Sequence, residues 1–262
     1  PLHAAAGTGL QQRPPFELMK KWSLILLIAA WPCAITVNAE KEHKPLGQAH
    51  AHNDYYHNRP LLDALAQGFC SVEADVFLKN GNLLVGHSQL ELRENRSLES
   101  LYLAPLAKRV KANGGSVHKT RALFHLMIDF KTDGPKTYAA LRPLLNKYRF
   151  MLTEFEPSKT KTKAVTIVIS GSRPRELMEK QKKRLAGYDG RLSDFGQVAS
   201  PHFMPWISDS WRLHFKWRGR GEMPEAEQDK LRRIVRQVHK DGKKIRFWAA
   251  PDNPAAWEAF YK

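Results

Sequence analysis

Hydrophobic and polar positions along the chain repeat with a period of two residues in some segments and of three to four in others. Apolar or alternating runs predict strands, because successive side chains of a strand point to opposite faces. The predicted strands are 71–76, 83–85, 123–131, 164–170, 191–195, 204–208 and 245–250. Helical spacing of apolar residues lies between them. The predicted helices are 61–67, 97–113, 137–151, 175–185, 224–240 and 254–261.

Seven strands that alternate with helices predict an α/β fold built on a parallel sheet. Their order favours a TIM (β/α)8-type barrel that lacks its last strand and helix in this chain, and the rival is a doubly wound sheet. Neither a Gly-x-Gly-x-x-Gly sequence nor a P-loop follows the first strand, which argues against nucleotide binding. In a TIM barrel, acidic and histidine residues at the carboxyl ends of the strands form the active site.

The first strand places two carboxylates on one face. Val72, Ala74 and Val76 lie on one side, and Glu73 and Asp75 lie on the other. Neighbouring carboxylates repel each other and lose hydration when buried, so we expect a counter-charge. A divalent cation that prefers oxygen ligands, Mg²⁺ or Ca²⁺, would supply it. The alternative is a strand edge with exposed acids.

Two further segments can bring polar groups to this pair. The turn at 80–82 sends the chain back through a short strand that ends at His87, so His87 is expected near the carboxylates. Alternation along 123–131 places four polar or sulfur-containing side chains on one face: His125, Met127, Asp129 and Lys131.

A histidine cluster precedes the first predicted helix. His50, His52, Asn53 and Asp54 lie within five residues of one another. Imidazole titrates near neutral pH, which suits acid–base chemistry or metal binding. The alternative is a polar surface loop.

The chain has 262 residues and a formal net charge of +16, from 42 Lys and Arg against 26 Asp and Glu. The basic residues are spread over separate segments and form no recognisable nucleic-acid module, so we expect no nucleic-acid partner. Most of this charge is expected on solvated helix surfaces, with attraction to an anionic membrane or to phosphate as a secondary role. One globular, monomeric domain suits this length and composition.

The first 39 residues are not expected in the folded domain. Residues 1–18 read as an over-extended start. Residues 19–39 have a basic start, an apolar centre and a small-residue cleavage site, which predicts a signal peptide and a secreted or periplasmic protein. The rival is an uncleaved amphipathic anchor. The folded domain is then 40–262, with Cys70 as its single cysteine and no internal disulfide.

Four short motifs occur in order along this domain: Ala51-His52-Asn53-Asp54-Tyr55, Ser71-Val72-Glu73-Ala74-Asp75-Val76, Gly86-His87 and Ile128-Asp129-Phe130-Lys131. Together they resemble the phospholipase C-like phosphodiesterase superfamily, which includes glycerophosphodiester phosphodiesterases and sphingomyelinase D toxins. They are most similar to a branch that includes the fungal family named for altered inheritance of mitochondria. That branch also shows a late block similar to Arg246-Phe247-Trp248-Ala249.

The resemblance implies a TIM-barrel phosphodiesterase with one divalent ion, Mg²⁺ or Ca²⁺. By position, the residues implied to hold the metal are Glu73, Asp75 and Asp129. His52 and His87 would be the acid–base pair, with His50 as a competitor for the role of His52, and Lys131 would lie near the phosphate. Many glycerophosphodiesterases have His-Arg-Gly at the first motif, whereas this chain has His-Asn-Asp, so Asn53 and Asp54 are additional candidates.

Three functions compete at this stage. The favoured one is a metal-dependent phosphoric diester hydrolase that acts on a glycerophosphodiester or phospholipid-type substrate, with cyclic phosphate formation as a variant of the reaction. The second is a non-catalytic barrel that binds phosphorylated or anionic ligands at the cell envelope. The third is a basic envelope protein that binds anionic polymer or lipid through Lys and Arg and is indifferent to chelators.

Overall fold

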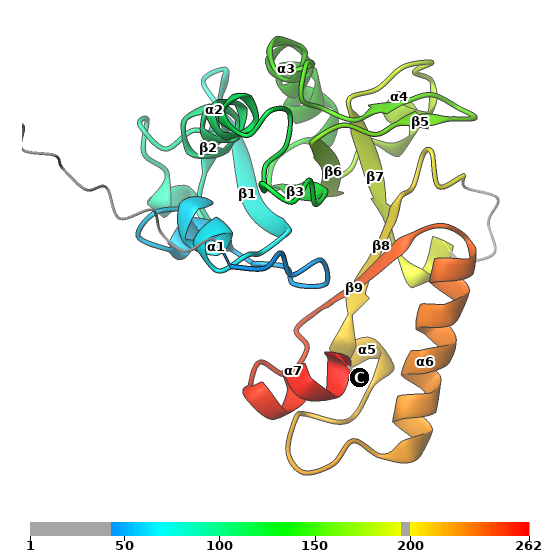
Figure 1. The fold of residues 1–262 in the computed structure, drawn as a ribbon. Coiled ribbons are helices and arrows are strands. Elements are labelled where there is room, and N and C mark those ends of the chain that lie inside the picture. The colour runs from blue at the N-terminus through cyan, green and yellow to red at the C-terminus, as the bar shows by residue number, and fades with distance from the viewer. Residues whose placement is uncertain (1–42, 195–199, 262) are drawn as a thin grey trace, which may run out of the picture. The chain divides into compact units, whose positions relative to one another are not determined.

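A computed structural model describes residues 43–194 and 200–261. The predicted extension at 1–18 and the predicted signal peptide at 19–39 lie outside the described residues. The principal sheet has the strand order β2-β1-β3-β6-β7-β8-β9 (Figure 1). Its strands are β1 (Ser71–Lys79), β2 (Asn82–Val85), β3 (Phe124–Phe130), β6 (Val165–Gly171), β7 (Ala186–Gly190), β8 (Trp206–Ser210) and β9 (Lys244–Trp248).

Strand β2 runs antiparallel to β1, and the remaining neighbours in this sheet are parallel. Ala51 adds a short parallel bridge to Val72 on the amino-terminal half of β1, which ties the histidine segment to the sheet. A separate hairpin joins β4 (Glu154–Phe155) to β5 (Thr160–Lys161). The mixed α/β class with a large, mostly parallel sheet is therefore confirmed.

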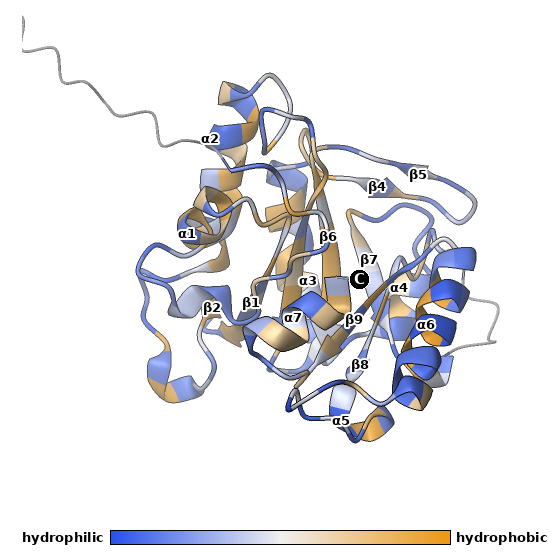
Figure 2. Cartoon of the chain, turned by 60° about the horizontal axis from the view of Figure 1, so that its bottom comes forward, coloured by the Kyte–Doolittle hydropathy of each residue, from blue (hydrophilic) through white to orange (hydrophobic). Residues whose placement is uncertain are grey.

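Helices lie before, between and after the strands of the sheet. They are α1 (Leu62–Ala66), α2 (Ala104–Ala112), α3 (Gly134–Lys147), α4 (Arg175–Glu179), α5 (Trp211–His214), α6 (Glu225–Lys240) and α7 (Pro254–Tyr261). Short 3-10 turns lie at η1 (Asp54–Tyr56), η2 (Gln89–Glu91) and η4 (Leu192–Asp194), and a π turn, η3 (Glu99–Leu103), leads into α2. Polar and apolar residues alternate around α6, as expected of a helix with one face on the protein (Figure 2).

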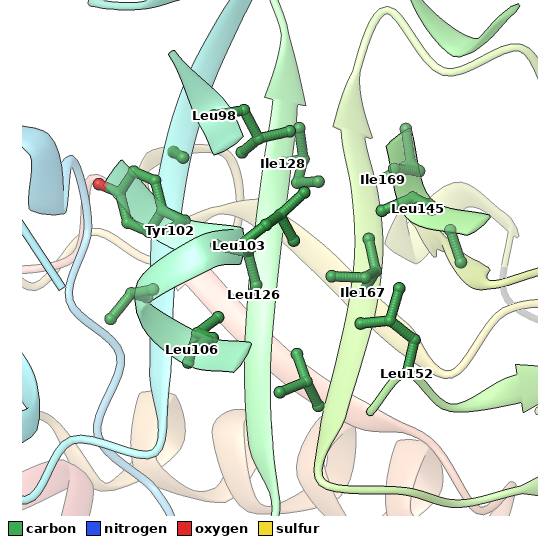
Figure 3. Packing of buried hydrophobic residues seen from close by; sticks show 14 of the residues in the cluster. Leu98, Tyr102, Leu103, Leu106, Leu126, Ile128, Leu145, Leu152, Ile167 and Ile169 are labelled. Atoms are coloured by element: carbon green, nitrogen blue, oxygen red, sulfur yellow. The ribbon is translucent and has the colours of Figure 1, made fainter. Parts of the chain in front are cut away.

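The core lies between the sheet and the helices that follow β2 and β3. Leu126 and Ile128 of β3 pack with Ile167 of β6 and with Leu103 before α2, and all four side chains are fully buried (Figure 3). The residues between them in β3 and β6, Met127 and Val168 among them, point to the opposite face. That second face carries the polar residues discussed below.

The sheet curls, although it is not closed. β2 and β9 are its edges, and no pairing joins them within 43–194 and 200–261, so a closed barrel is not found. Five strand spacings separate β1 from β9, about 24 Å in a flat sheet. The side chain of Arg246 on β9 nevertheless contacts Glu73 on β1 and Met127 on β3. An arginine side chain cannot span the flat distance, so the inner face of β9 turns toward β1.

Two element predictions were wrong, and one hairpin was not predicted. A strand was predicted at 191–195, but Leu192–Asp194 forms a 3-10 turn. The strand of this region is β7, which ends one residue before the predicted range. The sequence of β7, Ala-Gly-Tyr-Asp-Gly, contains no β-branched residue, so its pattern does not indicate a strand. Glycine is nevertheless required at position 187, because a Cβ there would collide with Pro205. The helix predicted to Leu185 ends at Glu179, and the β4–β5 hairpin was not predicted.

Candidate metal and catalytic site

Three carboxylates converge on the inner face of neighbouring strands. Glu73 and Asp75 come from β1, and Asp129 comes from β3, directly opposite Asp75 in the parallel register. One oxygen from each lies within 4.8 Å of the others. Residues paired in register have side chains on the same face of a sheet, which is why alternation and pairing together bring these acids into one cluster.

The two oxygens of Asp75 have different surroundings. Oδ2 accepts a hydrogen bond from the Tyr55 hydroxyl at 2.8 Å and lies 3.0 Å from His87 Nδ1 and 3.1 Å from Lys131 Nζ. Oδ1 is buried and has no hydrogen-bond partner among the described residues. A bare buried carboxylate oxygen is costly unless a donor or a cation satisfies it.

These residues fit a hard divalent cation. The cluster supplies carboxylate oxygens, the ligand type that Mg²⁺ and Ca²⁺ prefer, and the unpartnered Asp75 Oδ1 belongs to it. Glu73, Asp75 and Asp129 are therefore the residues that could hold such an ion.

Glu73 is held by two basic side chains. His50 Nε2 lies 3.1 Å from Glu73 Oε2, and the guanidinium of Arg246 donates to the same oxygen. Burial alone would raise the pKa of Glu73, but Arg246 and His50 outweigh it and lower the pKa to about 2. Glu73 is thus a carboxylate at any physiological pH.

Asp129 differs from Glu73. Burial raises its pKa, because this effect exceeds the opposing influence of Lys131, whose Nζ lies 2.9 Å away. Burial would lower the pKa of Lys131, but Asp129 and Asp75 together raise it, so this lysine stays cationic. Gly171, in the left-handed region at φ +69°, leaves room for Asp129, because a Cβ there would collide with Asp129 Oδ1.

The three histidines have distinct environments. His50 is nearly buried between Ser71 Oγ, 2.7 Å from its Nδ1, and Glu73, and burial is the main cause that lowers its pKa to about 4. His52 has a side chain 51% exposed, with Nε2 3.9 Å from Glu73 Oε2. His87 is 55% exposed and bonded to Asp75. His52 and His87 are therefore open to solvent at the rim, whereas His50 is a fixed, neutral partner of Glu73.

The structure brings seven of the predicted residues together: Glu73, Asp75, Asp129, Lys131, His87, His52 and His50. Asn53 adopts a left-handed conformation at φ 51° and precedes the η1 turn. Asp54 is fully buried, and it accepts hydrogen bonds from Leu61 N at 2.5 Å and from the Tyr102 hydroxyl at 3.0 Å. These contacts make Asp54 an anchor of the histidine loop.

The sequence interpretation missed two side chains at the site. Tyr55 is 3% exposed, and its hydroxyl lies 3.3 Å from His87 Nδ1 as well as bonding Asp75. It follows His52 by three residues, so its place in the first motif was a usable signal. Arg246 is far away in sequence, and the usable signals were its position in a predicted strand and its place in the late block that resembles the family.

Comparison with known proteins agrees with this arrangement of motifs. Residues 39–189 match the AIM6-like phosphodiesterase domain, which is more than half of the chain. The chain belongs to this family.

Individual relatives extend the similarity beyond the matched domain. Altered inheritance of mitochondria protein 6 of Eremothecium gossypii is 30% identical over 242 residues, which is 80% of this chain and 62% of that protein. The homolog of that protein in Arthroderma benhamiae is 28% identical over 236 residues, 78% of this chain and 73% of the relative. This chain therefore spans less than two thirds of the first of these AIM6 relatives.

No solved structure matches the chain. Among the described residues of this AIM6-like chain, every helix is too short or too polar to cross a bilayer.

Proposed function

We propose that the chain is a metal-dependent phosphoric diester hydrolase that acts on a glycerophosphodiester or phospholipid-type substrate. The observation that carries the proposal is the bare, buried Oδ1 of Asp75 within a three-carboxylate cluster that two exposed histidines flank. The phosphodiesterase domain family supports the reaction class. The curled sheet is, in this proposal, the greater part of a TIM (β/α)8-type barrel.

Glu73, Asp75 and Asp129 would hold one divalent cation, Mg²⁺ or Ca²⁺. When bound, that ion would neutralise phosphate oxygens and the charge that develops as the phosphodiester is displaced. The three carboxylates carry a charge of −3, and Lys131 and Arg246 compensate part of it. Lys131 bridges Asp75 and Asp129 at 3.1 and 2.9 Å, so its ammonium lies at the position where it can also contact a phosphate oxygen.

His52 and His87 would move the protons. A carboxylate only accepts hydrogen bonds, so the proton of His87 is on Nδ1 toward Asp75, and Nε2 is left to take up or release a proton. His52, which lies beside Glu73, would carry out the opposite proton transfer. One imidazole removes the proton of the attacking water or hydroxyl, and the other donates a proton to the leaving alkoxide. Attack by water gives hydrolysis, and attack by a hydroxyl of the substrate gives a cyclic phosphate.

Release of p-nitrophenol from bis(p-nitrophenyl) phosphate tests this proposal, with Mg²⁺, with Ca²⁺ and with EDTA. We expect release that depends on the metal and is lost in Asp75→Asn. Asp229→Asn removes an exposed carboxylate from α6 and should retain activity. A folded wild-type protein that binds the metal but turns over neither this substrate nor a lysophospholipid panel would favour the non-catalytic binding barrel instead.

A further inference from the structure

We propose a second binding site, for a phosphate-type anion, at the amino ends of β6 and β7. A pocket of about 60 Å³ lies there between the end of α3 and the segment that leads into β7. Its lining includes four cationic side chains, Arg142, Arg149, Lys183 and Arg184. None of these residues belongs to the carboxylate cluster, so the site is additional to the proposed phosphodiesterase centre.

Two buried donors of this pocket have no partner. Arg184 is 5% exposed, and its two terminal nitrogens donate to the backbone carbonyls of Gln181 and His202. Its Nε is buried and has no hydrogen-bond partner in the described part of the chain. Burial lowers the pKa of Arg184 despite the opposing influence of Tyr138 and Glu179.

Gln181 supplies the second unpaired donor. The Tyr138 hydroxyl donates to Gln181 Oε1 at 3.0 Å, which fixes the orientation of the amide. Its Nε2 is then buried without an acceptor among the described residues. A buried donor left unpaired costs about 1–3 kcal/mol. Oxygen atoms of one anion in the pocket could accept from both Gln181 and Arg184.

The surroundings are strongly basic. Phe155 of the β4–β5 hairpin pairs with Arg184 through two backbone hydrogen bonds, so the hairpin lies beside this segment. The segments 149–163 and 180–184 together contain eight Lys or Arg and two Glu. Each glutamate is shared between two basic side chains. Glu154 forms ion pairs with Arg149 and Lys163. Glu156 lies 3.5 Å from Lys159 and from Lys183.

Three lysines of these two segments are exposed and are not paired with either glutamate. They are Lys161, Lys180 and Lys182. A positive surface attracts anions and raises their local concentration. We therefore infer that the part of the ligand that stays outside the pocket is also negatively charged.

The size of the pocket limits the group that enters. Its volume is about that of two water molecules in the liquid, so it admits a phosphoryl group and leaves the remainder of the ligand outside on the lysines. A phosphate monoester offers three acceptor oxygens, which match the amide and guanidinium donors. Such a group can belong to a soluble phosphorylated molecule or to a phosphatidic-acid-type headgroup.

This pocket lies far from the carboxylates. Leu185 in its lining directly precedes Ala186, which pairs with Ile167 of β6, whereas Asp129 pairs with Ser170 near the carboxyl end of that strand. Three residues of strand span about 10 Å, and two strand spacings separate β7 from β3. A ligand in the pocket would therefore leave the carboxylate cluster free.

Inorganic phosphate is the first probe, used in calorimetric titration of the 262-residue chain in EDTA and at constant ionic strength. Arg142→Glu/Lys183→Glu changes two pocket side chains, and Arg233→Glu/Arg236→Glu makes the same charge change on the exposed face of α6. We expect wild type and the α6 variant to bind phosphate alike. The pocket variant should bind about tenfold or more weakly, because it loses charged contacts.

Glu73→Ala/Asp75→Ala should keep phosphate binding, which separates this site from the phosphodiesterase centre. Absence of binding to wild type, equal binding to both charge variants, or loss of binding in Glu73→Ala/Asp75→Ala would each overturn the proposal. Circular dichroism checks that every variant is folded.

Flotation with vesicles then distinguishes the two sources of the anion. Binding to phosphatidylcholine vesicles that contain phosphatidic acid, reversed by inorganic phosphate, would identify a lipid headgroup. Binding of free phosphate without vesicle binding would identify a soluble phosphorylated ligand. Vesicle binding that is the same in the pocket and α6 variants would count against the pocket, because it would reflect only net charge.

Discussion

His87 is oriented by Asp75: its Nδ1 lies 3.0 Å from Asp75 Oδ2, while the rest of the ring is half exposed. The same carboxylate is a candidate metal ligand. In the proposed mechanism, one side chain would therefore orient the imidazole that carries the proton and would also hold the cation.

Replacement of His87 by glutamine should remove a proton carrier and leave the carboxylates intact. We expect kcat to fall by roughly 10²–10⁴, with a small change in KM and with loss of one limb of the pH–rate profile. Steady-state kinetics on bis(p-nitrophenyl) phosphate measure this, with His239→Gln on α6 as the control. An unchanged kcat would remove His87 from the mechanism.

Tyr55→Phe should weaken the site without unfolding the protein. Phenylalanine keeps the packing but deletes the hydrogen bond to Asp75, and loss of an outer partner of a metal ligand costs about 10–100-fold in metal affinity or activity. Tyr148→Phe is a matched control, because it deletes a phenol that bonds Glu99 elsewhere. Equal effects of the two variants on metal affinity would contradict a positioning role for Tyr55.

A divalent cation should stabilise the folded chain. The carboxylates are gathered only in the folded state, so a cation at a hundred times its dissociation constant adds about 2.7 kcal/mol to the free energy of unfolding. The melting temperature should rise with Mg²⁺ or Ca²⁺, return with EDTA, and be insensitive to both in Asp75→Asn. A wild-type melting temperature that no divalent ion changes would argue against the metal site.

Acid should destabilise the protein partly through His125. Its ring lies 5.3 Å from that of Trp206, and burial followed by the charge of Lys244 lowers its pKa from 6.5 to about 3. The unfolded state binds the proton more readily, so this contribution to stability is present above pH 6.5 and is lost as the pH falls toward 3. Between pH 7 and 5 the loss is about 2 kcal/mol, at 1.36 kcal/mol for each pKa unit.

His125→Leu removes that titration and should flatten the dependence of stability on pH in urea unfolding. His50 also has a lowered pKa and is retained in the variant, so some acid sensitivity should persist. A pH dependence identical to that of the wild type would show that His125 does not titrate in this way.

Asp54→Ala should act on stability. It leaves Leu61 N and the buried Tyr102 hydroxyl without an acceptor, and each such loss costs about 1–3 kcal/mol. Leu61 has a left-handed backbone at φ 66°, which the hydrogen bond from its amide to Asp54 helps to hold. Urea unfolding should show the loss, and Asp63→Ala, in the exposed ion pair with Arg59, should cost far less.

The sequence was informative where local pattern and chemistry coincide. Alternation predicted that Glu73 and Asp75 share one face of β1 and that Asp129 lies on one face of β3. Parallel pairing of β1 with β3 places these two faces on the same side of the sheet. The contact of Arg246 with Glu73 was beyond prediction, since it depends on how far the sheet curls. Strand β7 was misplaced for a related reason. Contacts distant in sequence require its glycines, because Pro205 and Phe155 lie against Gly187 and Met204 lies against Gly190.

The contact between Arg246 and Glu73 joins residues 173 positions apart in the chain. During synthesis, β1 leaves the ribosome long before β9. Until β9 is in place, Lys131 is the cationic side chain of the described residues that faces the acid cluster, so burying the cluster without a bound cation remains unfavourable. Nascent chains should therefore keep this part of the sheet loosely packed until translation has passed Arg246, so that a competent centre arises late and all at once.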